Sequence, residues 1–171
     1  MYKRQTIESS GTISVQANVS STAAGNGLIL KSVGRISVTT TGATAGSPRL
    51  IGTAGGPITF WTTGTTGGVA LGNFTQLNTM QSGTSGADIT IGGGAASLSD
   101  ANRPSGAAEH SGADGISLGA GPATSVVVMR AGTGAISLNG HSTGTGDFSG
   151  INLYPGNDLV GATVNLSLIH I

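Results

Sequence analysis

Short stretches in which apolar and polar residues alternate recur along the whole chain. Each stretch has a small or turn-forming residue near its start, a β-branched apolar residue, then Ser, Thr or Asn, and then a second apolar residue. This alternation places the two apolar side chains on one face of a strand and the hydroxyl or amide on the other. The pattern therefore predicts short β-strands. They are expected at residues 11–15, 34–38, 56–60, 87–91, 114–118, 134–138, 149–153 and 162–166.

The spacing of these stretches predicts a repeat. Ile13 and Ile36 are 23 positions apart, and Ile36 and Ile58 are 22 positions apart. Further apolar runs lie between the stretches, at residues 28–30, 50–51, 69–71 and 126–129. We expect a two-strand repeat of about 22 residues at first, with looser spacing later and residues 92–109 bulging from one corner. Six or seven such coils would form a rod on the order of 30 Å long.

The fold class that these strands favour is all-β, a parallel β-helix or solenoid. A single coil of short strands cannot bury its own apolar face, whereas stacked coils bury a continuous core. Gly, Asn, Pro and Ser bound the strands, and no sustained 3.6-residue period predicts a helix. The alternative is a β-sandwich, which also has frequent turns. Very short strands and an aromatic content of only 4% favour the solenoid.

Composition narrows the functional classes. The 171 residues carry no net charge and are 37% hydrophobic, which argues against a disordered chain. Only 8% of residues are charged and no basic patch is present, so nucleic-acid binding is not expected. No apolar run approaches the roughly 20 residues of a membrane-spanning helix. Cysteine is absent, which excludes disulfides and thiolate zinc sites.

The two ends of the chain differ from its middle. Codons for residues 166–171 can be chosen so that the opposite strand encodes Tyr2, Lys3, Arg4 and Gln5 after a start codon. Such DNA resembles the transposon end sequence of shotgun sequencing libraries. We expect residues 1–5 and 166–171 to be adapter-derived and residues 6–165 to form one β-solenoid domain. The chain is then a fragment of a longer, metagenomic repeat protein; the alternative is a natural basic N-terminus and a natural apolar C-terminal strand.

The acidic residues do not form a recognisable catalytic or metal-binding motif. Asp114 and Asp147 stand beside a glycine and Asp88 lies two residues after one, in settings where Asp favours turns by bonding the local backbone. We therefore predict turn roles for them and no catalytic, metal-binding or cofactor-binding residue. The acidic residues are Glu8, Asp88, Asp100, Glu109, Asp114, Asp147 and Asp158.

Histidines and aromatic residues are the other candidates for a catalytic or sugar-binding site. His110 with Asp114 and a serine would resemble a catalytic triad, but no nucleophile motif accompanies them. We expect His110 and His141 to be exposed loop residues, and His170 falls in the adapter-derived tail. An exposed aromatic side chain could stack on a sugar. A corner position that covers the core is the favoured interpretation for Phe60, Trp61 and Tyr154.

The polar position of the repeated stretch is more orderly. If the coils stack, its hydroxyl and amide side chains form a ladder along one face of the solenoid. Such a ladder is either a solvated surface with hydrogen bonds between coils or a surface that binds glycan. Ice binding would need nearly uniform Thr and a constant coil length, which this chain lacks. The residues are Ser14, Ser37, Thr59, Thr90, Ser117, Ser137, Asn152 and Asn165.

These stretches, separated by Gly-, Thr-, Ser- and Ala-rich turns, resemble the passenger regions of large bacterial exoproteins. The similar families are the filamentous-haemagglutinin-like two-partner secretion proteins and the autotransporter adhesins, and the resemblance covers residues 11–166. It implies a right-handed parallel β-helix, export across the outer membrane and a role at the bacterial cell surface.

The predicted function is a structural and adhesive segment without catalytic activity or cofactor. Its expected partners are host or cell-surface glycans or matrix, together with neighbouring coils of a longer chain. One alternative is a polysaccharide-binding or polysaccharide-cleaving β-helix protein, which would need carboxylates gathered on one face. Another is a surface-layer or matrix protein without a receptor.

Overall fold

The regular structure of this protein consists of β-strands. The structure is a computed structural model that describes residues 3–81, 83–94, 104–119 and 126–170, and that part contains no helix. The strands are β1 (Arg4–Ser9), β2 (Ile13–Val15), β3 (Val19–Ser21), β4 (Gly27–Ser32), β5 (Ile36–Val38), β6 (Arg49–Thr53), β7 (Ile58–Thr62), β8 (Val69–Leu71), β9 (Thr75–Asn78), β10 (Ile89–Gly93), β11 (Ala108–His110), β12 (Ile116–Leu118), β13 (Val128–Arg130), β14 (Ala135–Ser142), β15 (Ile151–Leu153), β16 (Asp158–Val160) and β17 (Thr163–His170).

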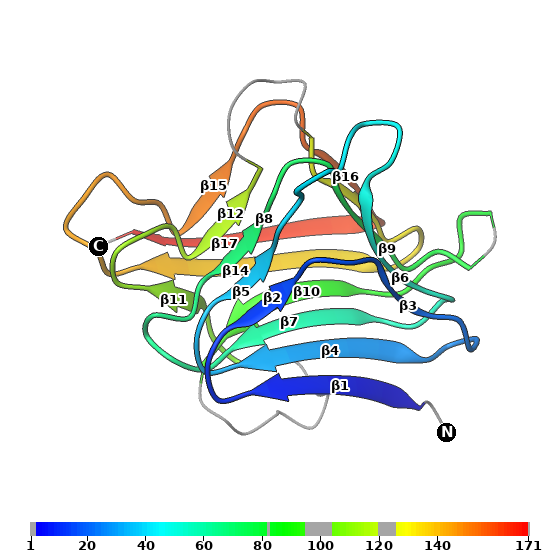
Figure 1. Cartoon of the computed structure of the whole chain (residues 1–171), viewed down its shortest axis with the longest axis horizontal. Coiled ribbons are helices and arrows are strands. Elements are labelled where there is room, and N and C mark those ends of the chain that lie inside the picture. The colour runs from blue at the N-terminus through cyan, green and yellow to red at the C-terminus, as the bar shows by residue number, and fades with distance from the viewer. Residues whose placement is uncertain (1–2, 82, 95–103, 120–125, 171) are drawn as a thin grey trace.

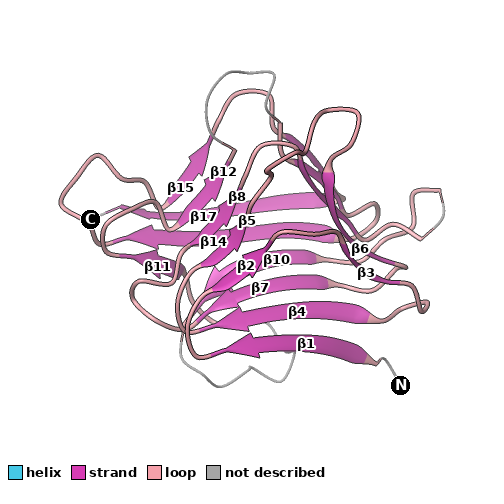
Figure 2. Ribbon diagram, viewed as in Figure 1, coloured by secondary structure: helices cyan, strands magenta, loops and turns pink. Residues whose placement is uncertain are grey.

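Three parallel sheets surround one core (Figures 1 and 2). Sheet A has the order β1-β4-β7-β10-β14-β11, with β17 also paired to β14; sheet B is β15-β12-β8-β5-β2, and sheet C is β16-β13-β9-β6-β3. The chain therefore visits A, B and C in turn and returns to A one layer further along. This confirms the predicted parallel β-helix solenoid. It excludes the sandwich alternative, whose sheets are antiparallel.

The predicted two-strand repeat of about 22 residues is wrong, because each coil has three strands. Ile13 does pair with Ile36 in sheet B. Ile58, however, lies in sheet A, where it pairs with Leu28 and with Ile89, 31 positions later. The same sequence pattern serves both sheets, so consecutive copies do not always stack. In the described part of the chain, five coils, the fourth of which has the additional strand β11, and the further strand β17 replace the six or seven coils that we predicted.

In-register columns of apolar side chains fill the space between the sheets. In sheet A, Leu30, Phe60, Ile91 and Leu138 stack on successive coils, and each is at most 1% exposed. Sheet C contributes Ile51, Leu77 and Met129, all fully buried. Sheet B contributes Ile36, Val69, Ile116 and Ile151. Stacking thus buries the apolar face that a single coil would leave exposed.

The segment predicted to bulge from a corner, residues 92–109, begins in β10 and ends in β11, which are both strands of sheet A. Strand β14 pairs with β10 through its first half and with β11 through its second half. Gly93 at the end of β10 and Gly106 before β11 exchange backbone hydrogen bonds of 2.8 and 2.7 Å. These bonds join the two ends of the segment that connects β10 to β11. Residues 95–103, and with them Asp100, lie outside the described part.

The two ends of the solenoid expose apolar side chains. Within the described residues, β1 pairs only with β4, and β17 pairs only with β14. Arg4 and Gln5 lie in β1, and residues 166–170 lie in β17; their adapter origin stays a prediction. The exposed apolar residues on the first and last layers are Ile7, Leu153, Val160, Val164 and Leu166.

Candidate functional site

The polar ladder that the sequence predicts on one face is divided between two faces. Because the repeated stretch occurs in both sheets A and B, its outward residues fall into two rows. The row on sheet A contains Thr59, Thr90, Ser137 and Asn165. The row on sheet B contains Ser14, Ser37, Ser117 and Asn152, with Ala70 between the second and the third. Each row repeats at the spacing of parallel strands, about 4.8 Å.

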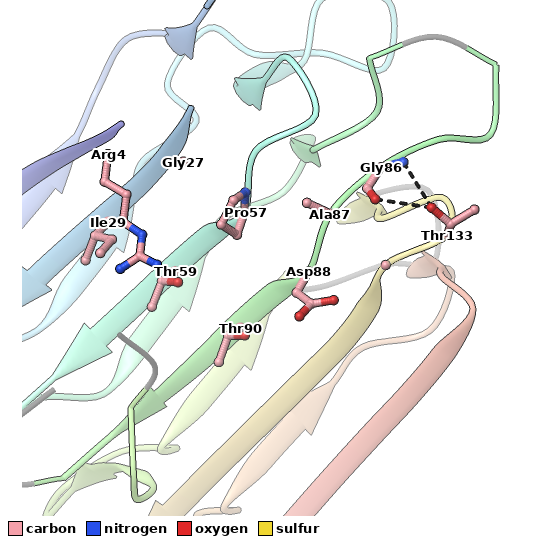
Figure 3. Close-up of a pocket in the computed structure, with 11 residues that line it drawn as sticks. Arg4, Gly27, Ile29, Pro57, Thr59, Gly86, Ala87, Asp88, Thr90 and Thr133 are labelled. Carbon is pink, nitrogen blue, oxygen red and sulfur yellow. Dashed lines mark hydrogen bonds between the residues drawn. The ribbon is translucent and has the colours of Figure 1, made fainter. Parts of the chain in front are cut away.

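The outer face of sheet A has a hollow of about 340 Å³ (Figure 3). Thr59 and Thr90 of the ladder line it, and Arg4 reaches from β1 across β4 toward Thr59. Two turns add the hydroxyl of Thr133 and the carboxylate of Asp88. Hydroxyl groups, a guanidinium and a carboxylate offer both donors and acceptors to a polar ligand.

Backbone contacts hold the wall of this hollow. Thr133 Oγ1 donates to the carbonyl of Gly86 at 3.2 Å and accepts from the Gly86 N–H at 3.4 Å. Asp88 Oδ1 accepts from the Ala135 N–H at 2.9 Å. The Asp88 carboxylate therefore ties two coils together, a contact 47 positions along the chain that the predicted local turn role does not include.

Sheet B has a larger and more open trough on its outer face, with a volume of about 540 Å³. Its floor consists of small residues on the third and fourth coils, Ala70, Gly72 and Gly119 among them. Arg35 and Ser37 of the second coil stand along one side. Arg35 is not among the residues predicted from the sequence, because its place beside this floor follows from the three-strand register.

The prediction that the histidines are exposed loop residues is wrong. His110 is the last residue of β11, and His141 lies in the second half of β14, which pairs with β11 in sheet A. His141 Nδ1 lies 3.2 Å from Glu109 Oε1, and its side chain is only 13% exposed. The sequence did not reveal this pairing, because the 32 positions between Glu109 and His141 include β12 and β13, the strands of sheets B and C in that coil.

His110 lies where sheets A and B meet. Its Nδ1 accepts a hydrogen bond from the Gly112 N–H at 3.0 Å, an arrangement that requires an unprotonated nitrogen. Burial, and then the nearby Arg35 guanidinium, lower the pKa of His110 below its ordinary value, against a smaller opposing effect of Asp114. His110 is therefore neutral at pH 7.

The structure brings His110 near Asp114 but does not complete a catalytic triad. Ser142 pairs with His110 in register, and its hydroxyl donates to the carbonyl of Ala113 at 3.1 Å. The Asp114 carboxylate accepts from the Ser149 N–H at 2.8 Å and from Asn152 Nδ2 at 2.9 Å. Each of these contacts connects neighbouring turns of the solenoid, which is a structural role.

A pH dependence of stability follows from the depressed pKa of His110. The unfolded chain takes up a proton near pH 6.5, whereas the folded chain resists protonation until a lower pH. The contribution of His110 to stability is thus fully present above about pH 6.5 and is lost as the pH falls below it. We expect urea denaturation to show a smaller loss between pH 7 and pH 5 in His110→Asn, whose amide oxygen replaces the Nδ1 acceptor. An equal loss in both proteins would contradict this assignment.

The corner position that the favoured interpretation gives Phe60 and Trp61 is wrong, because both lie within strand β7; Phe60 belongs to the core and Trp61 does not. Phe60 and Trp61 are both fully buried, although Trp61 lies on the outward side of β7. Lys31 Nζ is 5.0 Å from the centre of the Trp61 ring and 2.6 Å from Glu8 Oε1. Tyr154 is half-buried beside β15. Trp61 therefore offers no exposed ring face to a sugar.

The remaining acidic residues are dispersed. Asp158 pairs with Arg130 at 2.5 Å on sheet C, and Asp147 lies exposed in the turn before β15. In the described ranges, no three His, Asp or Glu side chains approach closely enough to hold a metal ion. The ionisable groups that form pairs in this part of the chain thus connect neighbouring coils.

Comparison with known proteins provides no relative. No known protein family, no curated protein and no solved structure matches this chain. Among the described residues there is also no helix with the length and apolar character needed to cross a membrane.

Proposed function

We propose that this chain is a structural and adhesive segment of a secreted or cell-surface bacterial repeat protein, without catalytic activity. The observation that carries the proposal is the pair of in-register polar rows on the outer faces of sheets A and B. They present hydroxyl and amide groups in the strand register, with Ala70 interrupting the row on sheet B, and both rows border a hollow.

Such a surface suits glycan or matrix partners. A polysaccharide offers hydroxyl groups at repeated intervals, and each neutral hydrogen bond contributes about 0.5–1.5 kcal/mol. Several such bonds from adjacent coils add up only if the side chains are fixed before binding. The parallel ladders of sheets A and B fix six of the eight side chains, which lie between two buried apolar neighbours on their strands: Ser14, Ser37, Thr59, Thr90, Ser117 and Ser137.

The dispersed carboxylates also support a binding role over a polysaccharide-cleaving one. Glycoside hydrolysis uses two carboxyl groups that flank one bond. In the described part of the chain, Asp88 and Asp114 accept backbone N–H groups, and Glu8 and Asp158 are paired with cations. These contacts connect neighbouring coils and leave the carboxylates apart from one another.

Binding to immobilised polysaccharides tests the proposal. A panel of neutral and acidic polysaccharides and matrix proteins is incubated with the whole chain, and retention is measured. We expect at least one to bind, and the double variant Thr90→Val, Ser137→Ala to weaken that binding by about 5-fold or more, given the loss of two hydroxyl groups.

A matched control removes two hydroxyl groups from sheet C. Ser20→Ala with Thr22→Val alters exposed residues outside both rows and should leave retention unchanged. Equal retention of the Thr90/Ser137 variant and the unaltered chain would contradict a role for the row on sheet A. Ordered self-assembly without retention on any surface would favour the surface-layer alternative instead.

A further inference from the structure

The trough on sheet B contains an unpaired cation. The ion pairs in the described part of the chain are Glu8–Lys31, Asp158–Arg130 and Glu109–His141, and none includes Arg35. The Nε atom of Arg35 is buried and has no hydrogen-bond partner. A half-buried guanidinium has given up part of its hydration, so an anion that reaches it gains a strong, geometrically defined interaction.

The floor beside Arg35 leaves room for a ring. Along the neighbouring coil, Ala70 and Gly72 line this floor, and neither has a side chain larger than a methyl group. On the far side of this low row, Ser117 projects from the next coil, with Gly119 two positions further along the chain. Hydroxyl groups therefore flank the floor, and Arg35 lies at one end of it.

We propose that this trough binds a carboxylated saccharide, with the carboxylate on Arg35 and the ring hydroxyls on Ser37 and Ser117. The inference rests on the proposed glycan-binding function and specifies its ligand class and its site. A planar guanidinium matches a carboxylate with two parallel hydrogen bonds, which a neutral sugar cannot supply. The hydroxyls on either side match the remaining, uncharged part of a sugar acid.

The surroundings of Arg35 agree with an anionic ligand. His110 is the titratable group next to it, and it is neutral at pH 7, so it neither pairs with Arg35 nor repels the ligand. Asp114, the acidic neighbour of His110, already accepts hydrogen bonds from Ser149 and Asn152. Arg35 thus keeps its charge available to the trough.

Calorimetry with two probes tests the proposal. The acidic probe is a galacturonic acid oligosaccharide, and the neutral probe is its carboxyl-reduced counterpart of equal length. We expect the unaltered chain to bind the acidic probe about 10-fold to 100-fold more tightly, the range for a hydrogen bond to a charged group. Arg35→Gln should abolish this preference and leave binding of the neutral probe within about 2-fold.

Two further variants keep the result interpretable. Arg130→Gln removes an equal charge from sheet C and should preserve the preference for the acidic probe. Ala70→Leu fills the floor without changing charge and should weaken both probes, even if Arg35→Gln fails to fold. Equal affinity for the acidic and the neutral probe would overturn the carboxylate site and leave the proposed glycan binding intact. If neither probe and no polysaccharide of the panel binds, the carboxylate site and the proposed function are both overturned. A preference that survives in Arg35→Gln would place the site elsewhere.

Discussion

Replacement of Phe60 with Ala is expected to lower the free energy of unfolding by about 3–5 kcal/mol. The Phe60 side chain is fully buried and stands between Leu30 and Ile91 in the column of sheet A. Its removal leaves a cavity that neighbouring coils cannot close, because their strands are fixed in register on both sides. Urea denaturation followed by circular dichroism measures the loss, which is a large share of the stability of an ordinary domain.

Phe148→Ala provides the matched control. The same ring is deleted there from a half-buried residue in the turn before β15, beside Gly144 and Gly146. We expect a much smaller loss of stability than for Phe60→Ala. Similar losses at the two positions would mean that Phe60 is not in a packed column.

Gly140→Ala is expected to destabilise the fold by about 3 kcal/mol, at the upper end of the cost of overpacking. A Cβ at Gly140 would lie 2.1 Å from the carbonyl oxygen of Gly150 and 3.0 Å from Cγ1 of Ile151. Gly150 directly precedes β15 and Ile151 is its first residue, so the chain entering sheet B lies against β14 at this point. Neither strand can move without breaking its own ladder, so the strain is not relieved locally.

Gly46→Ala is the control for this change. A Cβ at Gly46 would have no atom within 4 Å, and the residue lies in the turn before β6. Thermal unfolding of the two variants should therefore differ widely, with Gly46→Ala close to the unaltered chain. A Gly140→Ala protein of full stability would show that β14 and β15 are further apart than the structure has them.

The strands and their inward faces could be predicted from the sequence, but their arrangement could not. Alternation marks a strand wherever it occurs, and it marked the inward Ile36 and Ile89 correctly. It does not say which sheet a strand joins, because sheets A and B share one pattern. Sheet C was missed as a third strand per coil, since segments such as Arg49–Thr53 and Thr75–Asn78 do not carry that pattern.

The candidate sites could be predicted only in part for the same reason, because a local pattern does not determine which strands are neighbours. The polar residues of the two rows were identified from the sequence, but their division between two faces depends on which coils are neighbours. Arg35 beside Ala70, and Glu109 beside His141, are contacts between coils that no local pattern encodes. The length of each turn determines which residues of neighbouring coils meet, and turn length varies along this chain.

Disulfide formation between introduced cysteines tests the three-sheet register most directly, since the chain has no cysteine of its own. Ser14 and Ser37 are partners on adjacent strands of sheet B, at a spacing of about 4.8 Å that a disulfide can span. Ser37 and Thr59 are 22 positions apart and lie in different sheets. We predict rapid oxidation of Ser14→Cys with Ser37→Cys and none of Ser37→Cys with Thr59→Cys. Efficient oxidation of the second pair, without the first, would contradict the three-strand coil.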